Sequence, residues 1–228
     1  MPVEFTSRLD KKQAIAVLAW FPVHILALPF LFTLLMMRGL IDSVAANFLV
    51  YAVGAIYMLL TLRRFFRRDF DPLCDHPFRT LLLVFSAFWL ARTGETLIVL
   101  LFEALKFVDV NGNNESVIAM VRENFGPTAA MAVLLAPIVE ESLFRAGIFG
   151  LLRRKSRFWA YAVSVLAFGL YHVLGDAIFD PRQLIFLLQY IPSSLALAYV
   201  YDRSNSIWAS ILLHMLCNGV STLAVMAS

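Results

Sequence analysis

The sequence predicts an all-α fold: a polytopic bundle of about seven transmembrane helices with a cytoplasmic N-terminus. Of the 228 residues, 61% are hydrophobic and 15% are charged, and the mean hydropathy is +0.77. A soluble domain has about 45–50% apolar and about 25% charged residues. The hydrophobic residues also form runs close to the roughly 20 residues that cross a bilayer as a helix. Basic residues gather in alternate loops between these runs, which is typical of a multi-pass membrane protein.

Seven runs contain few charges and are long enough to span. They are Ala14 to Met37, Val44 to Leu62, Thr80 to Phe107, Thr128 to Leu152, Phe158 to Ile178, Gln183 to Tyr201 and Ser206 to Met226. The first run is longer than the hydrophobic region of a signal peptide, so we expect it to be retained. Such spans leave only short loops, and residues 1–228 are therefore predicted to form a single integral-membrane domain.

The distribution of charge predicts both orientation and partners. Most of the 19 Lys and Arg residues lie in the N-terminal tail or in the loops after the second and fourth runs. By the positive-inside rule these segments are cytoplasmic. The net charge of +3 comes from loop anchors and not from a basic groove, so we expect the lipid bilayer as a partner and no nucleic acid. The two cysteines do not have the number or spacing of a disulfide framework or a zinc site.

Ionisable residues inside the runs gather in the C-terminal half, where each requires a partner or a function. The fourth run places Glu140 and Glu141 side by side, with Arg145 four residues after Glu141. Glu141 and Arg145 therefore share a helix face and are expected to form an ion pair. Glu140 points about 100° away and has no local partner, which suits it to general-base work. Pro137 is expected to kink this helix.

Two further runs carry polar groups at a similar depth. Phe168 and His172 lie four residues apart in the fifth run, and His214 and Asn218 lie four apart in the seventh. These residues can meet Glu140 in one buried cavity. A carboxylate and an imidazole can deprotonate a water, while N–H donors stabilise the oxyanion of a tetrahedral intermediate. This combination predicts water-mediated amide hydrolysis without a nucleophilic serine.

The chain resembles the CPBP intramembrane proteases, also called the Abi or CAAX amino-terminal protease group, which includes the type II CAAX prenyl endopeptidases. The resemblance covers residues 128–220, the expected catalytic core. It consists of Glu140-Glu141-x-x-x-Arg145, Phe168-x-x-x-His172 and His214-x-x-x-Asn218, in that order on separate predicted helices.

The resemblance implies a glutamic endopeptidase that is independent of metal and of any other cofactor. Glu140 and His172 would activate water, and His214 and Asn218 would form the oxyanion site. Glu141, Arg145 and Phe168 would support them. The implied substrate is a peptide or a membrane protein, and the implied location is a bacterial cell membrane.

Other interpretations remain open at this stage. The chain could be a non-catalytic membrane scaffold or a bacteriocin-immunity protein. A zinc metalloprotease is less favoured because the sequence has no H-E-x-x-H motif and asparagine is a poor zinc ligand. A transporter could also use buried carboxylates and histidines, as a proton relay. We expect no role in the site for His24, which has no acidic or histidine partner at ligand spacing, and a packing or lipid-facing role for Tyr171.

Overall fold

The computed structural model describes residues 5–107 and 109–228, and the regular structure within these ranges is helical. The predicted domain 1–228 therefore includes residues 1–4 and 108, which lie outside the described residues. In chain order the helices are α1 (Lys11–Pro22), η1 (Val23–Ala27), α2 (Leu28–Met37), α3 (Ser43–Thr61), α4 (Arg63–Arg68), α5 (Asp71–Asp75), α6 (Pro77–Ala104), α7 (Gly112–Glu123), α8 (Phe125–Ala130), η2 (Met131–Leu135), α9 (Ala136–Glu140), η3 (Glu141–Phe149), α10 (Gly150–Leu152), α11 (Arg157–Ala177), η4 (Pro181–Phe186), α12 (Leu187–Ser204) and α13 (Ile207–Ala227). The predicted all-α bundle is confirmed.

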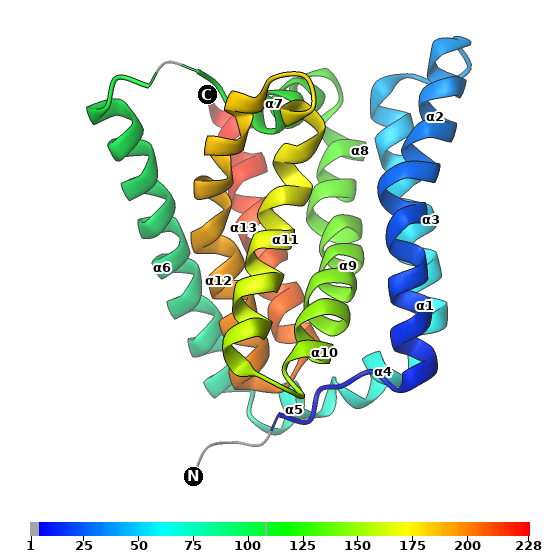
Figure 1. The fold of residues 1–228 in the computed structure, drawn as a ribbon, viewed down its shortest axis with the longest axis vertical. Coiled ribbons are helices and arrows are strands. Elements are labelled where there is room, and N and C mark those ends of the chain that lie inside the picture. The colour runs from blue at the N-terminus through cyan, green and yellow to red at the C-terminus, as the bar shows by residue number, and fades with distance from the viewer. Residues whose placement is uncertain (1–4, 108) are drawn as a thin grey trace.

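Six stretches within the described ranges are long and apolar enough to cross a membrane. They are Lys11–Met37, Ser43–Thr61, Pro77–Ala104, Arg157–Ala177, Pro181–Ser204 and Ile207–Ala227. The remaining predicted span, Thr128 to Leu152, is helical throughout, but it consists of the short consecutive segments α8, η2, α9, η3 and α10. The first described residues and the C-terminal end of the chain lie at opposite ends of the bundle (Figure 1), as an odd number of crossings requires. Seven spans and a cytoplasmic N-terminus stay predictions.

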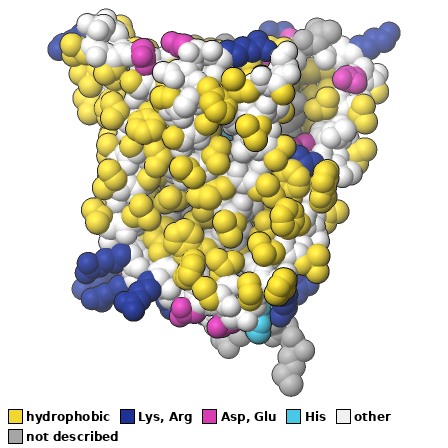
Figure 2. All heavy atoms as spheres, turned by 180° about the vertical axis from the view of Figure 1, so that it is seen from behind, with side chains coloured by type: hydrophobic (Ala, Val, Ile, Leu, Met, Phe, Trp, Pro, Cys, Tyr) yellow, Lys and Arg dark blue, Asp and Glu magenta, His cyan; other side chains and the backbone are white. Residues whose placement is uncertain are grey.

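The flank of the bundle is covered by large hydrophobic side chains that have no protein contact to bury them. Phe30 is 67% exposed, Leu82 70% and Phe158 70%. Figure 2 shows such side chains over one whole face, with the charged side chains gathered at the two ends. Exposed apolar surface on this scale marks contact with lipid in a chain of this composition.

The segment from α8 to α10 lies inside the bundle, between α3 on one side and α11 and α13 on the other (Figure 1). In η3, every residue except Ile148 is buried. A helix buried on all sides carries little lipid-facing surface. The segment is therefore placed where polar side chains can be shielded from lipid by neighbouring helices.

The expected disturbance at Pro137 takes the form of a change in helical register. The N–H of Ala136 donates to the carbonyl of Met131, five residues back, which is a π-type bond. A second π-helical segment, η3, begins at Glu141, directly after the short helix α9. Short π-helical segments are frequent at functional sites because they change the direction of neighbouring side chains.

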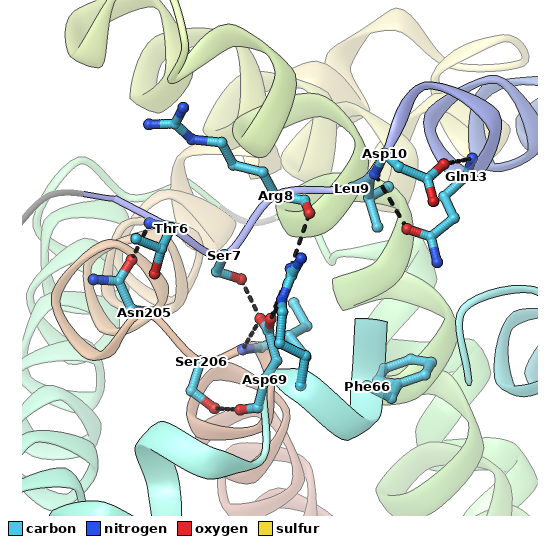
Figure 3. A network of polar contacts seen from close by, with 12 residues as sticks. Thr6, Ser7, Arg8, Leu9, Asp10, Gln13, Phe66, Asp69, Asn205 and Ser206 are labelled. Carbon is cyan, nitrogen blue, oxygen red and sulfur yellow. Dashed lines mark hydrogen bonds and ion pairs between the residues drawn. The ribbon is translucent and has the colours of Figure 1, made fainter. Parts of the chain in front are cut away.

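The N-terminal segment, residues 5–10, contacts two loops at one end of the bundle, as Figure 3 shows. Ser7 is buried, and its hydroxyl donates to Asp69 Oδ2 in the turn between α4 and α5. The Tyr201 hydroxyl donates to the carbonyl of Ser7 over 2.8 Å. Asp69 also binds the loop between α12 and α13, because its carbonyl accepts from Ser206 Oγ at 2.5 Å and its carboxylate from the N–H of Ile207 at 3.3 Å.

We expect this end of the bundle to lose stability as the pH rises. Burial raises the pKa of the Asp69 carboxyl above its ordinary value of 3.8, against the opposing effect of hydrogen bonds from Ser7 and Arg68. The folded protein then holds this proton more tightly than the unfolded chain does. The resulting stabilisation is complete below the ordinary value and is lost as the pH rises through the raised pKa. In thermal denaturation in detergent, Asp69→Asn should show a smaller dependence of Tm on pH than the unchanged protein. An identical pH dependence would contradict this prediction.

Candidate active site

A cavity of about 480 Å³ inside the bundle brings together the four residues expected to be catalytic. Glu140 ends α9, His172 lies in the last two turns of α11, and His214 and Asn218 lie on one face of α13. All four line the cavity. The three helices converge because the segment that carries Glu140 packs against α13 and, through η3, against α11.

Glu140 stands at the centre of this group and is only 3% exposed. Its Oε1 accepts a hydrogen bond from the Tyr51 hydroxyl at 3.0 Å. Its Oε2 lies 3.7 Å from Nε2 of His172 and also 3.7 Å from Nε2 of His214. Among the described residues this buried oxygen has no hydrogen-bond partner. The two imidazoles and one carboxylate oxygen thus converge at distances slightly longer than a direct hydrogen bond.

The surroundings of His172 determine which ring nitrogen carries the proton. Nδ1 lies 2.8 Å from the carbonyl oxygen of Phe168. A carbonyl only accepts, so Nδ1 must donate and Nε2 of the neutral ring presents a lone pair toward Glu140. The ring is held between Phe168, with ring centres 4.5 Å apart, and Tyr190, stacked at 4.6 Å. Phe168 therefore supports His172 through both its backbone and its ring.

His214 is oriented by the second glutamate. Its Nδ1 lies 2.8 Å from Glu141 Oε1, and the other oxygen of Glu141 accepts from Ser210 Oγ at 2.5 Å. Arg145 Nε lies 3.3 Å from the same Oε2, and both side chains are fully buried. The expected Glu141–Arg145 ion pair is therefore present, and it extends to His214. A carboxylate at Nδ1 fixes the orientation of the imidazole.

Asn218 is held by a carbonyl that the backbone leaves unused. Its Nδ2 donates to the carbonyl of Ala132 over 2.8 Å. In the π register of η2, the donor to Ala132 would be residue 137, which is a proline and has no N–H. The Ala136 N–H already donates to Met131. The amide of Asn218 supplies the missing donor, and this bond fixes its orientation while one N–H of the amide remains.

The match to a protein family covers these same helices. The family model described as Type II CAAX prenyl endopeptidase Rce1-like matches residues 122–220, which include all three motif blocks. Residues 122–220 are thus similar to the type II CAAX prenyl endopeptidases. The resemblance expected from the motifs is thereby confirmed for this part of the chain.

Two curated relatives match a segment of similar length. The chain is 39% identical over 88 residues to "UPF0177 protein YaiF" of Lactococcus lactis subsp. lactis (strain IL1403), covering 37% of this chain and 34% of that protein. It is 34% identical over 86 residues to "Putative membrane peptidase YdiL" of Bacillus subtilis (strain 168), covering 37% of this chain and 32% of the relative. The match thus spans about a third of the length of each relative. No solved structure matches the chain significantly.

The expected location is confirmed by these findings together. The described residues include six helices long and apolar enough to span a membrane, and both relatives are bacterial. The segment that matches the family model therefore lies within a multi-pass protein of a bacterial membrane.

Three residues of the site that are not motif positions were not expected there. Tyr51 in α3 donates to Glu140, and its hydroxyl lies 2.9 Å from that of Tyr171 in α11. The Tyr171 hydroxyl lies 3.3 Å from Nε2 of His24 in η1. The expectation of a packing or lipid-facing Tyr171 and a His24 without a role was based on spacing along the chain, which does not show contacts between distant helices. The available signal was polar atoms within otherwise apolar runs.

The cavity wall also carries the ion pair of the third predicted span. Arg92 Nη2 lies 2.5 Å from Glu95 Oε2 in α6, and Ser193 in α12 donates to Glu95. Arg92 also donates to Ser221 in α13, at 3.2 Å. This cluster explains how two charges are accommodated in a helix that otherwise faces lipid.

Replacing Arg145 with leucine is expected to destabilise the protein strongly. Glu141 would remain fully buried without its cation, and breaking a buried pair in this way costs about 3–5 kcal/mol. Thermal denaturation in detergent measures the effect. Arg203→Leu is the matched control, because Arg203 is exposed at the end of α12 and its loss should change stability by less than about 0.5 kcal/mol. Equal Tm values for the two variants would contradict the prediction.

Within residues 5–107 and 109–228, no group of three or more His, Cys, Asp or Glu side chains could hold a metal ion. The donors nearest to such an arrangement are Glu140, His172 and His214. Their nitrogen-to-oxygen distances of 3.7 Å are short enough for a shared water. Metal independence itself stays a prediction that requires a chemical test.

Proposed function

We propose that this protein is an intramembrane endopeptidase that hydrolyses a peptide bond with water activated by Glu140 and His172. The observation that carries the proposal is the position of Glu140 Oε2, 3.7 Å from Nε2 of both His172 and His214 in a cavity within the bundle. The family match and the name of the Bacillus relative support a peptidase. Peptides or membrane proteins are the proposed substrates.

Water activation follows from these distances. A separation of 3.7 Å is too long for a direct hydrogen bond, but a water oxygen can contact both groups if it lies to one side of the line between them. One hydrogen of that water points to Glu140 Oε2, and the other points to the lone pair of His172 Nε2. Glu140 takes the first proton as the water oxygen attacks the carbonyl carbon of the substrate. His172 aligns the water through the second hydrogen.

The negative charge that develops on the carbonyl oxygen is stabilised by two donors. His214 donates from Nε2 in its protonated form, which Glu141 stabilises from the other side of the ring. Asn218 donates through the N–H that does not bind Ala132. Donors held in place before the reaction stabilise an oxyanion strongly, and loss of one such donor costs about 2.7–4 kcal/mol.

Bond cleavage returns the proton to the products. The tetrahedral intermediate collapses, the carbon–nitrogen bond breaks, and Glu140 gives the proton it took from water to the leaving amine. The carboxylic acid product and the free amine then leave, and Glu140 is again a carboxylate. The cycle consumes one water and needs no covalent intermediate.

A peptide library tests this function directly. The purified protein in detergent should produce new peptide termini that mass spectrometry identifies, and the same preparation of Glu140→Gln should produce none. If neither the unchanged protein nor Glu140→Gln produces new termini although both are folded in detergent, the proposal is wrong and a non-catalytic scaffold is favoured.

Cleavage is expected to continue in the presence of a strong chelator. The proposed water activation uses a carboxylate and an imidazole, so removal of divalent metal should change the rate by less than about twofold. Activity assays with EDTA and with 1,10-phenanthroline, accompanied by metal analysis of the protein, check this outcome. Loss of activity that added zinc restores would show a metalloprotease instead.

A further inference from the structure

A chain of hydrogen-bonding groups leads away from the oxygen of Glu140 that does not face the histidines. Oε1 accepts from the Tyr51 hydroxyl at 3.0 Å, and the Tyr51 and Tyr171 hydroxyls are 2.9 Å apart. Tyr171 lies 3.3 Å from Nε2 of His24. His24 and Tyr51 lie outside residues 122–220, so two of the four members come from the part of the chain that the family match does not cover.

The donors and acceptors in this chain point in one direction. A carboxylate only accepts, so Tyr51 donates to Glu140 and its oxygen is left to accept from Tyr171. Tyr171 has then used its proton and must accept from His24. Nε2 of His24 therefore carries a proton when Glu140 is ionised. Such an unbroken series of donors can transfer a proton by a shift of each hydrogen to the next oxygen.

The far end of the chain reaches a second cavity, of about 400 Å³. His24, Tyr51, Tyr171 and His172 all contribute to its lining, together with side chains of α2. Glu140 lines the first cavity and is absent from the lining of the second. Four residues border both spaces: Asn47, Tyr51, Asn113 and His172. The chain therefore connects the carboxylate with a space that differs from the one a substrate would fill.

The fold holds His24 in place at this position. Pro22 ends α1, and the π-helical segment η1 follows, where the Leu28 N–H donates to the carbonyl of Val23. His24 is 1% exposed and packs against α3 at Gly54. A Cβ at residue 54 would lie 3.2 Å from Nδ1 of His24. Any larger residue at this position would therefore crowd the imidazole ring. An imidazole buried this deeply in an apolar helix usually has a polar partner or a function.

We propose that His24, Tyr171 and Tyr51 form a proton relay that positions Glu140 and exchanges its proton with the second cavity. The inference rests on the proposed role of Glu140 as the general base. In the forward direction a protonated His24 gives its Nε2 proton to Tyr171, Tyr171 gives its own to Tyr51, and Tyr51 gives its own to Glu140. His24 ends neutral with a proton on Nδ1, and Glu140 ends protonated. The reverse shift restores the carboxylate while a substrate occupies the catalytic cavity.

Other ionisable groups surround Glu140 and define the alternatives to the relay. They are His172 on α11, Tyr190 on α12, His214 on α13, and Glu141 and Arg145 on the following segment η3. His172 and His214 face Oε2, whereas the relay meets Oε1. Removal of one relay member thus leaves the histidines at Oε2 in place.

Kinetic measurements on single variants test the relay. Tyr51→Phe, Tyr171→Phe and His24→Leu should each lower kcat by about 10- to 100-fold, the range for a lost hydrogen bond to a charged group, with KM changed less than about twofold. Tyr57→Phe is the matched control, because Tyr57 is also in α3 and its hydroxyl donates to the carbonyl of Ala16. His24→Gln keeps a donor for Tyr171 but cannot be protonated, so kcat should stay low. Thermal denaturation confirms that each variant is folded.

Infrared difference spectra taken between low and high pH test the chain without any substrate. Glu140→Gln identifies the carboxyl band of Glu140. Tyr51→Phe should shift this band to higher wavenumber, Tyr171→Phe and His24→Leu should shift it less, and His24→Gln and Tyr57→Phe should leave it in place.

If the band is the same in Tyr51→Phe and in the unchanged protein, or if cleavage is normal in His24→Leu and Tyr171→Phe, the relay is wrong. Absence of cleavage with the expected band shifts would reject the endopeptidase and retain the hydrogen-bond chain.

Discussion

Glu140→Gln is expected to lower kcat by about 10⁴-fold, the upper range for loss of a general base. Glutamine has nearly the same size and can still accept a hydrogen bond from Tyr51, but it cannot take a proton from water. The cavity and the packing of α9 should therefore remain while the chemistry stops. Steady-state cleavage of a peptide from the library, measured by mass spectrometry, gives the comparison.

Glu123→Gln is the matched control for this variant. Glu123 is an exposed carboxylate at the end of α7 and does not line the cavity, so the same chemical change there should leave kcat unchanged. Glu140→Gln with more than about a tenth of the normal rate would remove Glu140 from the mechanism. The histidines would then have to activate water without it.

His172→Phe is expected to lower kcat by about 10²- to 10³-fold. Phenylalanine keeps an aromatic ring against Tyr190 and Phe168, which contact the imidazole at 4.6 and 4.5 Å. It removes the Nε2 lone pair that aligns the water beside Glu140. The loss should appear in kcat with little change in Tm, and both quantities are measured on the same detergent preparation.

His76→Phe provides the control for His172. His76 is exposed in the loop before α6, so its replacement should alter neither kcat nor Tm. A His172→Phe variant within about threefold of the normal rate would show that His172 only packs between helices. The water would then be held by Glu140 and His214 alone.

The fold could be predicted to a large extent from hydropathy. Six of the predicted apolar runs correspond to described helices that are long and apolar enough to cross a membrane. Hydropathy predicts them because a bilayer of fixed thickness requires an apolar segment of about 20 residues. The fourth run was predicted as one continuous span, whereas the structure divides it into alternating α- and π-helical segments. The sequence shows where a proline lies, but it does not show whether the backbone around it forms α-type or π-type hydrogen bonds. That register depends on donors from other helices, such as Asn218.

The candidate site was predicted only in part, because the prediction depended on motifs in the C-terminal half. Glu140, His172, His214 and Asn218 do line one cavity, and their catalytic roles stay proposals. Tyr51 and His24 were missed, since each is a single polar residue in an apolar run without a partner nearby in sequence. Their contacts with Glu140 and Tyr171 join residues far apart in the chain.

The sequence by itself determined that the chain lies in a membrane as a helical bundle, because a composition so rich in apolar residues cannot be solvated by water. It also placed the polar residues at a common depth, because helical rise converts spacing into distance. Only the tertiary structure decided which polar atoms face each other. Helix rotation and packing set those directions, and they bring Tyr51 to one oxygen of Glu140 and two imidazoles to the other.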